Sequence, residues 1–214
     1  MRGIAPRLLP VLLLFAAAAC LAQEVVDRIA ARVETDVILL SDIRALSRYQ
    51  VFVDGKSESD QQILQRLIDQ WIVRNEANVS RISQPSDEEI ERSLTRLKRS
   101  LSSAEEYDER RKQSGVSDED VRRMLKSQLY LSNYLDSRFR PSIQIDEKAI
   151  QEFYETRVIP RAKSRGQNPP TLEAAHDYIQ EALVQRAINE QADKWLKESR
   201  TRVRVEILLP EGQK

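Results

Sequence analysis

Residues 59–73 read SDQQILQRLIDQWIV, and this stretch carries the clearest helical pattern of the chain. Its apolar side chains recur at steps of three and four residues between Ile63 and Ile72, while charged and amide side chains occupy the other faces. Such spacing lines up apolar groups on one stripe of a helix with 3.6 residues per turn. The stretch therefore predicts an amphipathic helix that packs on a hydrophobic core.

The same pattern repeats downstream behind helix-start signals. Ser86 and Ser103 are each followed three residues later by a glutamate, which is the arrangement of a capping box. Further helix starts are expected at Ser117, Asp146 and Thr171, whose side chains can accept hydrogen bonds from free backbone N–H groups. Glycine is scarce, at five residues in 214, and 32% of the chain is charged. This composition favours helices with strongly solvated outer faces.

The two ends of the folded part differ from this helical middle. Residues 24–40 are rich in β-branched and aliphatic side chains, and the sequence Glu34-Thr35-Asp36 interrupts them as a turn would, so we expect a hairpin followed by a short helix to about residue 53. Residues 203–207 alternate apolar and charged side chains with the period of a strand. A lone strand leaves its backbone groups unpaired. The predicted fold is therefore mainly α, with an N-terminal β-hairpin paired to a C-terminal strand.

Residues 1–22 have the organisation of a signal peptide. Arg2 and Arg7 form a positive start, an apolar run follows from residue 8 to 19, and Ala22 is a suitable last residue before cleavage. Cys20 leaves an alternative open, in which cleavage before this cysteine would allow a lipid anchor. We expect a periplasmic protein comprising residues 23–214 or, in the alternative, a membrane-anchored lipoprotein.

Charge and hydropathy restrict the possible partners of this mature part. Without Arg2 and Arg7 the chain has 32 basic and 34 acidic residues, so it lacks the basic surplus that is typical of nucleic-acid-binding proteins. No later stretch approaches the roughly 18 uninterrupted apolar residues of a transmembrane helix. We expect a single domain that neither binds nucleic acid nor crosses the membrane.

Several segments, taken in order, resemble a known family. They are VVDRIAARV at 25–33, VILLSDI at 37–43, LQRLIDQ at 64–70, SDEEI at 86–90, GVS at 115–117, and the C-terminal helix with Trp195 and Leu196 before the last strand. Their order resembles the N-terminal core domain of the SurA, PrsA and PpiD chaperones over nearly the whole mature chain. The resemblance implies a multi-helix chaperone core whose clients are unfolded exported or outer-membrane proteins.

One departure from that family concerns activity. Many relatives carry a parvulin prolyl-isomerase domain between the helix around Tyr154 and the C-terminal helix, whereas residues 157–170 alone occupy this place here and are expected to form a linker. A parvulin site uses histidines in a glycine-rich frame, but His176 is the only histidine of the chain. The sequence therefore favours a protein without isomerase activity.

The sequence contains no pattern that indicates another kind of catalytic or metal site. A hydrolase triad needs a base beside its nucleophile, and His176 is better explained as a surface or capping residue. The acidic clusters at 87–89 and 118–120 follow helix starts, where carboxylates complement the helix dipole. We expect no catalytic residue, no cofactor and no metal.

The resulting hypothesis is an ATP-independent holdase with a partly exposed apolar groove. Aromatic residues are the candidates for binding clients there, although the same residues can equally fill the core, because periodicity does not separate the two cases. A scaffold or lipoprotein adaptor that binds one folded partner is the first alternative, and a prolyl isomerase is the second. The groove candidates are Tyr107, Tyr130, Tyr134, Phe139 and Tyr154.

Overall fold

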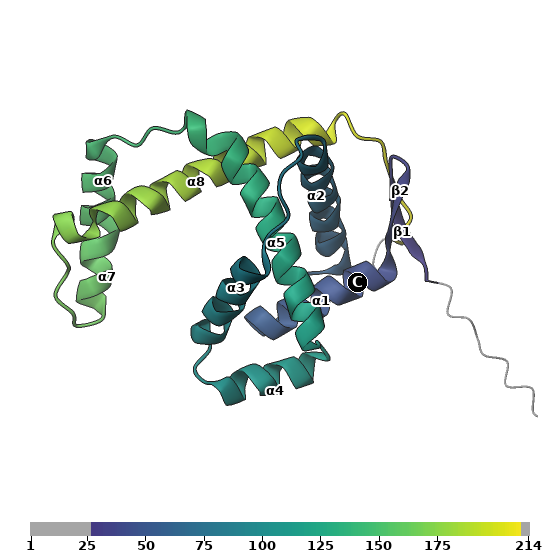
Figure 1. Cartoon of the computed structure of the whole chain (residues 1–214), viewed down its shortest axis with the longest axis horizontal. Coiled ribbons are helices and arrows are strands. Elements are labelled where there is room, and N and C mark those ends of the chain that lie inside the picture. The colour runs from purple at the N-terminus through teal and green to yellow at the C-terminus, as the bar shows by residue number, and fades with distance from the viewer. Residues whose placement is uncertain (1–26, 211–214) are drawn as a thin grey trace, which may run out of the picture.

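The computed structural model describes residues 27–210, so the predicted signal peptide and Cys20 lie outside the described residues. Within this range the fold is mainly helical with one small three-stranded antiparallel sheet, as the sequence predicts. Figure 1 shows the sheet at one end of the molecule, where the first and last described segments lie side by side.

The sheet has the strand order β2-β1-β3. Strands β1 (Ile29–Val33) and β2 (Asp36–Leu39) form the hairpin, and β3 (Val205–Ile207) pairs antiparallel with the other edge of β1. The turn is made by Glu34 and Thr35, and Glu34 takes a positive φ of 52° that non-glycine residues rarely adopt. The predicted pairing of the N-terminal hairpin with the C-terminal strand is confirmed.

The main body consists of α1 (Leu40–Asp54), α2 (Asp60–Val79), α3 (Asp87–Ser100), α4 (Ala104–Ser114) and α5 (Asp118–Phe139). A second, smaller group follows, with the 3₁₀ turn η1 (Arg140–Ser142), α6 (Glu147–Phe153), the π-helical turn η2 (Tyr154–Val158) and α7 (Ile159–Ser164). The long helix α8 (Leu172–Arg200) then returns to the main body and leads into β3.

The predicted helix starts are confirmed at atomic level. Each N-cap side chain accepts a hydrogen bond from the backbone N–H three residues later, at Ser86, Ser103, Ser117, Asp146 and Thr171. The box at Ser103 is only half formed, because the Glu106 side chain accepts from the N–H of Ser102 instead, at 2.7 Å. Local hydrogen bonding thus fixes these helix boundaries.

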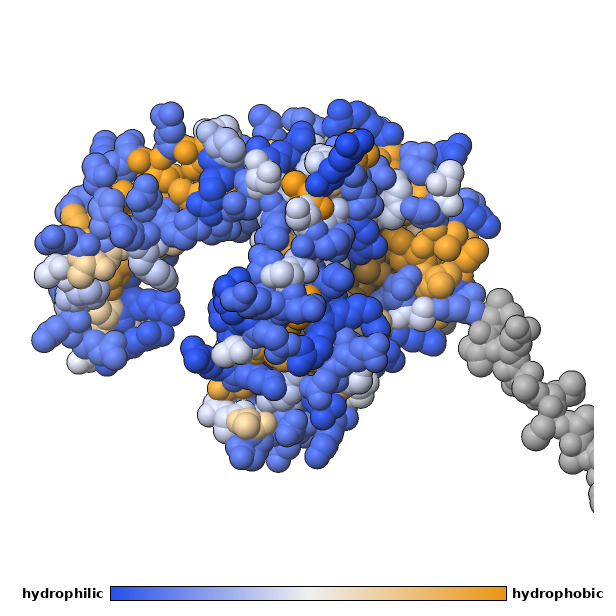
Figure 2. Space-filling view, viewed as in Figure 1, coloured by the Kyte–Doolittle hydropathy of each residue, from blue (hydrophilic) through white to orange (hydrophobic). Residues whose placement is uncertain are grey.

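Two separate hydrophobic clusters support the two parts of the molecule. The larger one joins the sheet with α1, α2, α5 and the end of α8, and includes Ile43, Phe52, Ile63, Tyr134 and Trp195. The smaller cluster is centred on Ile150, Ala175 and Ile179, where α6 packs on the first half of α8. Figures 1 and 2 show the result as an arch in which α8 carries the α6–α7 lobe away from the body, with open space beneath it.

The prediction of a linker at residues 157–170 is wrong for the first half of that range. Helix continues through η2 and α7 to Ser164, and only the residues from Arg165 to Pro170 are irregular. Pro160 lacks an N–H and would normally interrupt a helix. Here the chain widens into a π turn just before it, with the N–H of Ile159 bonded to the carbonyl of Tyr154, and this turn accommodates the proline.

Among residues 27–210, no helix combines the length and the apolar character needed to cross a membrane.

Candidate functional site: a trough beside helix α1

Three of the predicted groove residues are part of the core. Tyr107, Tyr130 and Tyr134 are all buried, with 2–6% of each residue exposed. The Tyr107 hydroxyl donates to Asp118 at 3.0 Å, and its ring meets Phe52 edge-on at a centroid distance of 5.4 Å. Burial raises the pKa of the Tyr107 and Tyr134 hydroxyls, as expected for groups removed from water. These three rings fill the core and offer no surface to a ligand.

The other two candidates lie in different parts of the molecule, Phe139 at the edge of the large hydrophobic cluster and Tyr154 at the small one. Phe139, at the end of α5, is half-buried against Trp195 at a centroid distance of 6.2 Å. Tyr154 belongs to the smaller lobe, where its hydroxyl donates to the carbonyl of Pro170 at 2.6 Å. The five aromatic residues therefore do not converge on one groove, and the accessible apolar surface of the fold lies elsewhere.

A large hollow, of about 1050 Å³, lies where α1, α2, α3 and α5 meet. Its apolar floor consists of Leu46, Tyr49, Val53, Leu97 and Leu125. Its walls are polar, with amide, hydroxyl and charged side chains on every element that borders it. An apolar floor with hydrogen-bonding walls suits an extended peptide, whose side chains leave water while its backbone groups still find partners.

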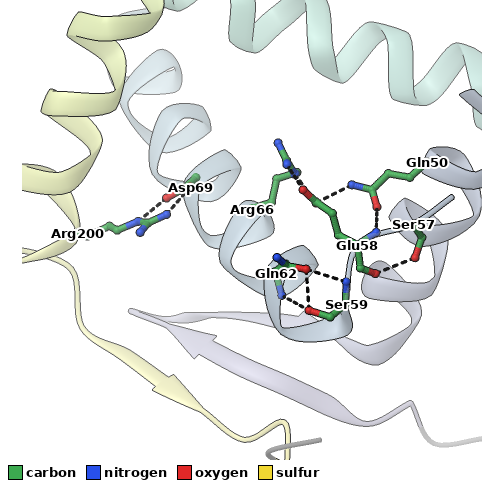
Figure 3. A network of polar contacts seen from close by, with 8 residues as sticks. All are labelled: Gln50, Ser57, Glu58, Ser59, Gln62, Arg66, Asp69 and Arg200. Carbon is green, nitrogen blue, oxygen red and sulfur yellow. Dashed lines mark hydrogen bonds and ion pairs between the residues drawn. The ribbon is translucent and has the colours of Figure 1, made fainter. Parts of the chain in front are cut away.

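One wall of this hollow is held by the network that Figure 3 shows. Glu58, in the loop between α1 and α2, accepts from Arg66 Nε at 2.9 Å and from Gln50 Nε2 at 2.8 Å. The hydrogen bond from Arg66 is the main cause of the lowered pKa of the Glu58 carboxyl, and the bond from Gln50 adds to it. Ser59 and Gln62 close the start of α2 beside it with a capping box. The loop is thereby fixed between the two helices.

A second hollow, of about 510 Å³, lies on the hairpin side of α1. Its apolar lining comes from β2, α1, α2 and α5, and consists of Val37, Ile38, Ala45, Leu46, Leu67, Trp71 and Met124. The indole N–H of Trp71 donates to Asp36 at 2.7 Å, which fixes the ring at the edge of the hairpin. Arg48, Arg74 and Arg123 border the hollow together with the carboxylate of Asp42. Because Arg123 is paired with Asp120, the rim carries a small excess of positive charge.

The two hollows adjoin, because Leu46 of α1 and Gln70 of α2 line both of them. We call the combined surface the trough. Figure 2 shows hydrophobic residues gathered over the hairpin and the neighbouring start of α1, at the hairpin end of this trough. Val37, which is 48% exposed, lines the second hollow and is a large apolar side chain left accessible on the hairpin. The trough is thus continuous with apolar surface that the fold leaves uncovered.

Sequence reasoning missed the trough for an identifiable reason. Val37 was assigned to a strand and Trp71 to the apolar stripe of 63–72, and both assignments are correct. However, the apolar stripe of α2 extends beyond the surface that packs on the core. Leu67 and Trp71 therefore remain half-buried, while Ile63 and Ile68 are buried. The feature of the sequence that could have indicated the trough was the width of this apolar stripe, together with the aromatic Trp71 near its end.

Comparison with known proteins adds no assignment: the chain matches no protein-family model, and no curated protein matches it significantly.

Proposed function

We propose that the protein is an ATP-independent periplasmic holdase that binds unfolded exported or outer-membrane proteins in the trough. The observation that carries this proposal is the hollow between the hairpin, α1, α2 and α5, which is apolar and bordered by three arginines. The resemblance of the segment order to SurA-type core domains supports the same function, and the expectation of a signal peptide supports the periplasm.

The lining of the trough suits variable clients. Apolar groups of an unfolded chain gain about 25 cal/mol for each Å² that leaves water. Met124 is flexible and polarisable, so it can adapt to side chains of different shape, while the Trp71 ring offers a broad apolar face. The guanidinium groups of Arg48 and Arg74 can bind backbone carbonyls or carboxylates of the client. Contacts of this kind have little sequence specificity.

Release without ATP requires that each contact be weak. The trough is open to solvent and no cover lies over it among the described residues, so a client can leave as soon as its own folding competes for its apolar groups. The exposed faces of the helices carry most of the charged residues, which keeps a loaded complex soluble. Affinity then comes from several weak contacts along the trough.

Suppression of the aggregation of an unfolded porin by the mature protein tests the proposal. We expect suppression at a few-fold excess, and a loss of it in the double variant Val37→Thr with Met124→Gln, which removes apolar surface from the trough. The matched control is Val51→Thr with Val79→Thr, because both of these valines are exposed but lie outside the trough. No suppression at several-fold excess, or equal loss in both variants, would contradict the proposal.

Trp71 provides a direct reading of occupancy. The chain contains only two tryptophans, and Trp195 can be replaced by phenylalanine to leave Trp71 as the single reporter. We expect its fluorescence to shift to the blue when an unfolded client enters the trough, because the indole loses contact with water. A pull-down that yields one folded partner without this shift would favour the adaptor, and catalysis of proline isomerisation in a peptide would favour the isomerase.

A further inference from the structure

The smaller lobe carries a hollow of about 350 Å³ that has no role in the trough. Three arginines, at positions 157, 161 and 165, line it at four-residue intervals along η2, α7 and the residue after α7. This interval places side chains on one side of a helix. The other lining residues are Phe153, Val158, Ala162, Gln167 and Tyr178, so no carboxylate borders the hollow.

The positive charge of this hollow is not neutralised by the rest of the described chain. None of the ion pairs formed among residues 27–210 involves Arg157, Arg161 or Arg165. Arg186 lies in a neighbouring hollow that shares Arg157 and Arg161, and it is paired with Glu190 at 2.9 Å. Three unpaired guanidinium groups at one hollow attract an anion with several oxygens.

Apolar and aromatic groups lie directly beside these charges. Tyr178 of α8 is 68% exposed, which is unusual for an aromatic ring, and it borders the same hollow as the half-buried Phe153 and Val158. A free inorganic anion would make no use of such groups. At a membrane surface, by contrast, arginines bind headgroup phosphates while tyrosine and aliphatic side chains enter the interfacial layer.

From these observations we propose that the α6–α7 lobe binds the phosphate-bearing surface of an anionic lipid membrane through Arg157, Arg161 and Arg165. The position of the lobe supports this role, since Figure 1 shows it at the far end of α8, away from the sheet and from helices α1 and α2, which border the trough. Docking at this end leaves the trough free, so membrane binding and client binding are independent properties of the two parts.

Flotation with lipid vesicles tests the proposal. The protein comprising residues 23–214, which lacks Cys20 and therefore cannot carry an acyl chain, is purified and mixed with vesicles of phosphatidylcholine alone or of phosphatidylcholine with phosphatidylglycerol. We expect binding to the anionic vesicles only. The triple variant of Arg157, Arg161 and Arg165 to glutamine should weaken this binding on the order of a hundredfold, or about fivefold for each arginine. Tyr178→Ala should weaken it by a smaller factor.

The matched control removes the same charge elsewhere, through glutamine at Arg99, Lys126 and Lys197, which are exposed residues outside every hollow described above. If it weakens binding as much as the triple variant does, binding follows net charge and the proposal fails. Competition by inorganic phosphate but not by chloride of equal ionic strength would indicate a free-anion site and would also overturn it. Suppression of aggregation should be unchanged in the triple variant, so the two proposals fail separately.

Discussion

Glu34 and Arg204 exchange two hydrogen bonds across 170 residues of sequence, and these bonds attach the last strand to the hairpin. The N–H of Glu34 donates to the carbonyl of Arg204 at 3.0 Å, and the N–H of Arg204 donates to Glu34 Oε1 at 2.7 Å. This arrangement requires the positive φ of Glu34, a backbone conformation that is strained for a glutamate and unstrained for glycine. The tip of the hairpin therefore combines backbone strain with a contact that joins both ends of the fold.

The variants Glu34→Ala and Glu34→Gly separate these two effects. Alanine loses the carboxylate and keeps the strained φ, so we expect it to destabilise the fold by about 1 kcal/mol. Glycine also loses the carboxylate, but it adopts a positive φ without strain and should recover most of that loss. Urea denaturation measures both values. Hydrogen exchange at Glu206 and Leu208, whose N–H groups face β1, should accelerate in both variants, and unchanged exchange would show that the carboxylate does not hold β3.

The ion pair of Arg200 and Asp69 joins the end of α8 to the middle of α2, as Figure 3 shows. Arg200 donates from Nε at 2.6 Å and from Nη2 at 2.5 Å to the two carboxylate oxygens. We expect a coupling energy of about 1 kcal/mol from a double-mutant cycle with Asp69→Asn and Arg200→Gln, since the pair is partly exposed but bidentate. Arg200→Lys should restore less than half of it, because an amine cannot form the fork. Zero coupling would contradict this account.

His176 is expected to titrate above its ordinary range. Its ring nitrogens lie 3.3 Å from Asp177 and from Glu147 at the start of α6, and these carboxylates raise the pKa of the imidazole, Asp177 first. Because the folded state holds the proton more tightly, the contribution to stability is complete below pH 6.5 and is lost as pH rises through the raised pKa. As His176 is the only histidine, a proton NMR titration gives this pKa directly. Glu147→Gln should lower it, and a value of 6.5 or less in the native protein would refute the contact.

The two hydrophobic clusters predict that the α6–α7 lobe can unfold separately from the main body. Ile179 is fully buried in the small cluster, so Ile179→Ala should release α6 and α7, and hydrogen exchange should increase there while the main body stays protected. Phe52 is fully buried in the large cluster, and Phe52→Ala should lower the stability of the body by about 3–5 kcal/mol. If Ile179→Ala increases exchange equally throughout the chain, the lobe is not a separate unit.

Local chemistry explains why much of this fold was predictable. The helix starts at Ser86 and Ser117 depend on side chains that bond to backbone groups three residues away, so neighbours in sequence determine them. The hairpin and the alternating strand at 203–207 follow from periodicity together with the need of a strand for a partner. The candidate site was not predictable in this way, because Tyr107 and Trp71 differ in what surrounds them rather than in their own pattern.

The sequence by itself determined the helices, their caps and the strands, because hydrogen bonds and side-chain periodicity within short segments specify these features. It also indicated that the hairpin pairs with the last strand, because a lone strand needs a partner for its backbone groups. Only the tertiary structure decided which apolar side chains remain accessible, since burial depends on how far a neighbouring helix extends over them. It also brought Arg157, Arg161 and Arg165 to a hollow together with Tyr178 of another helix, by continuing a helix through a proline that would ordinarily end it.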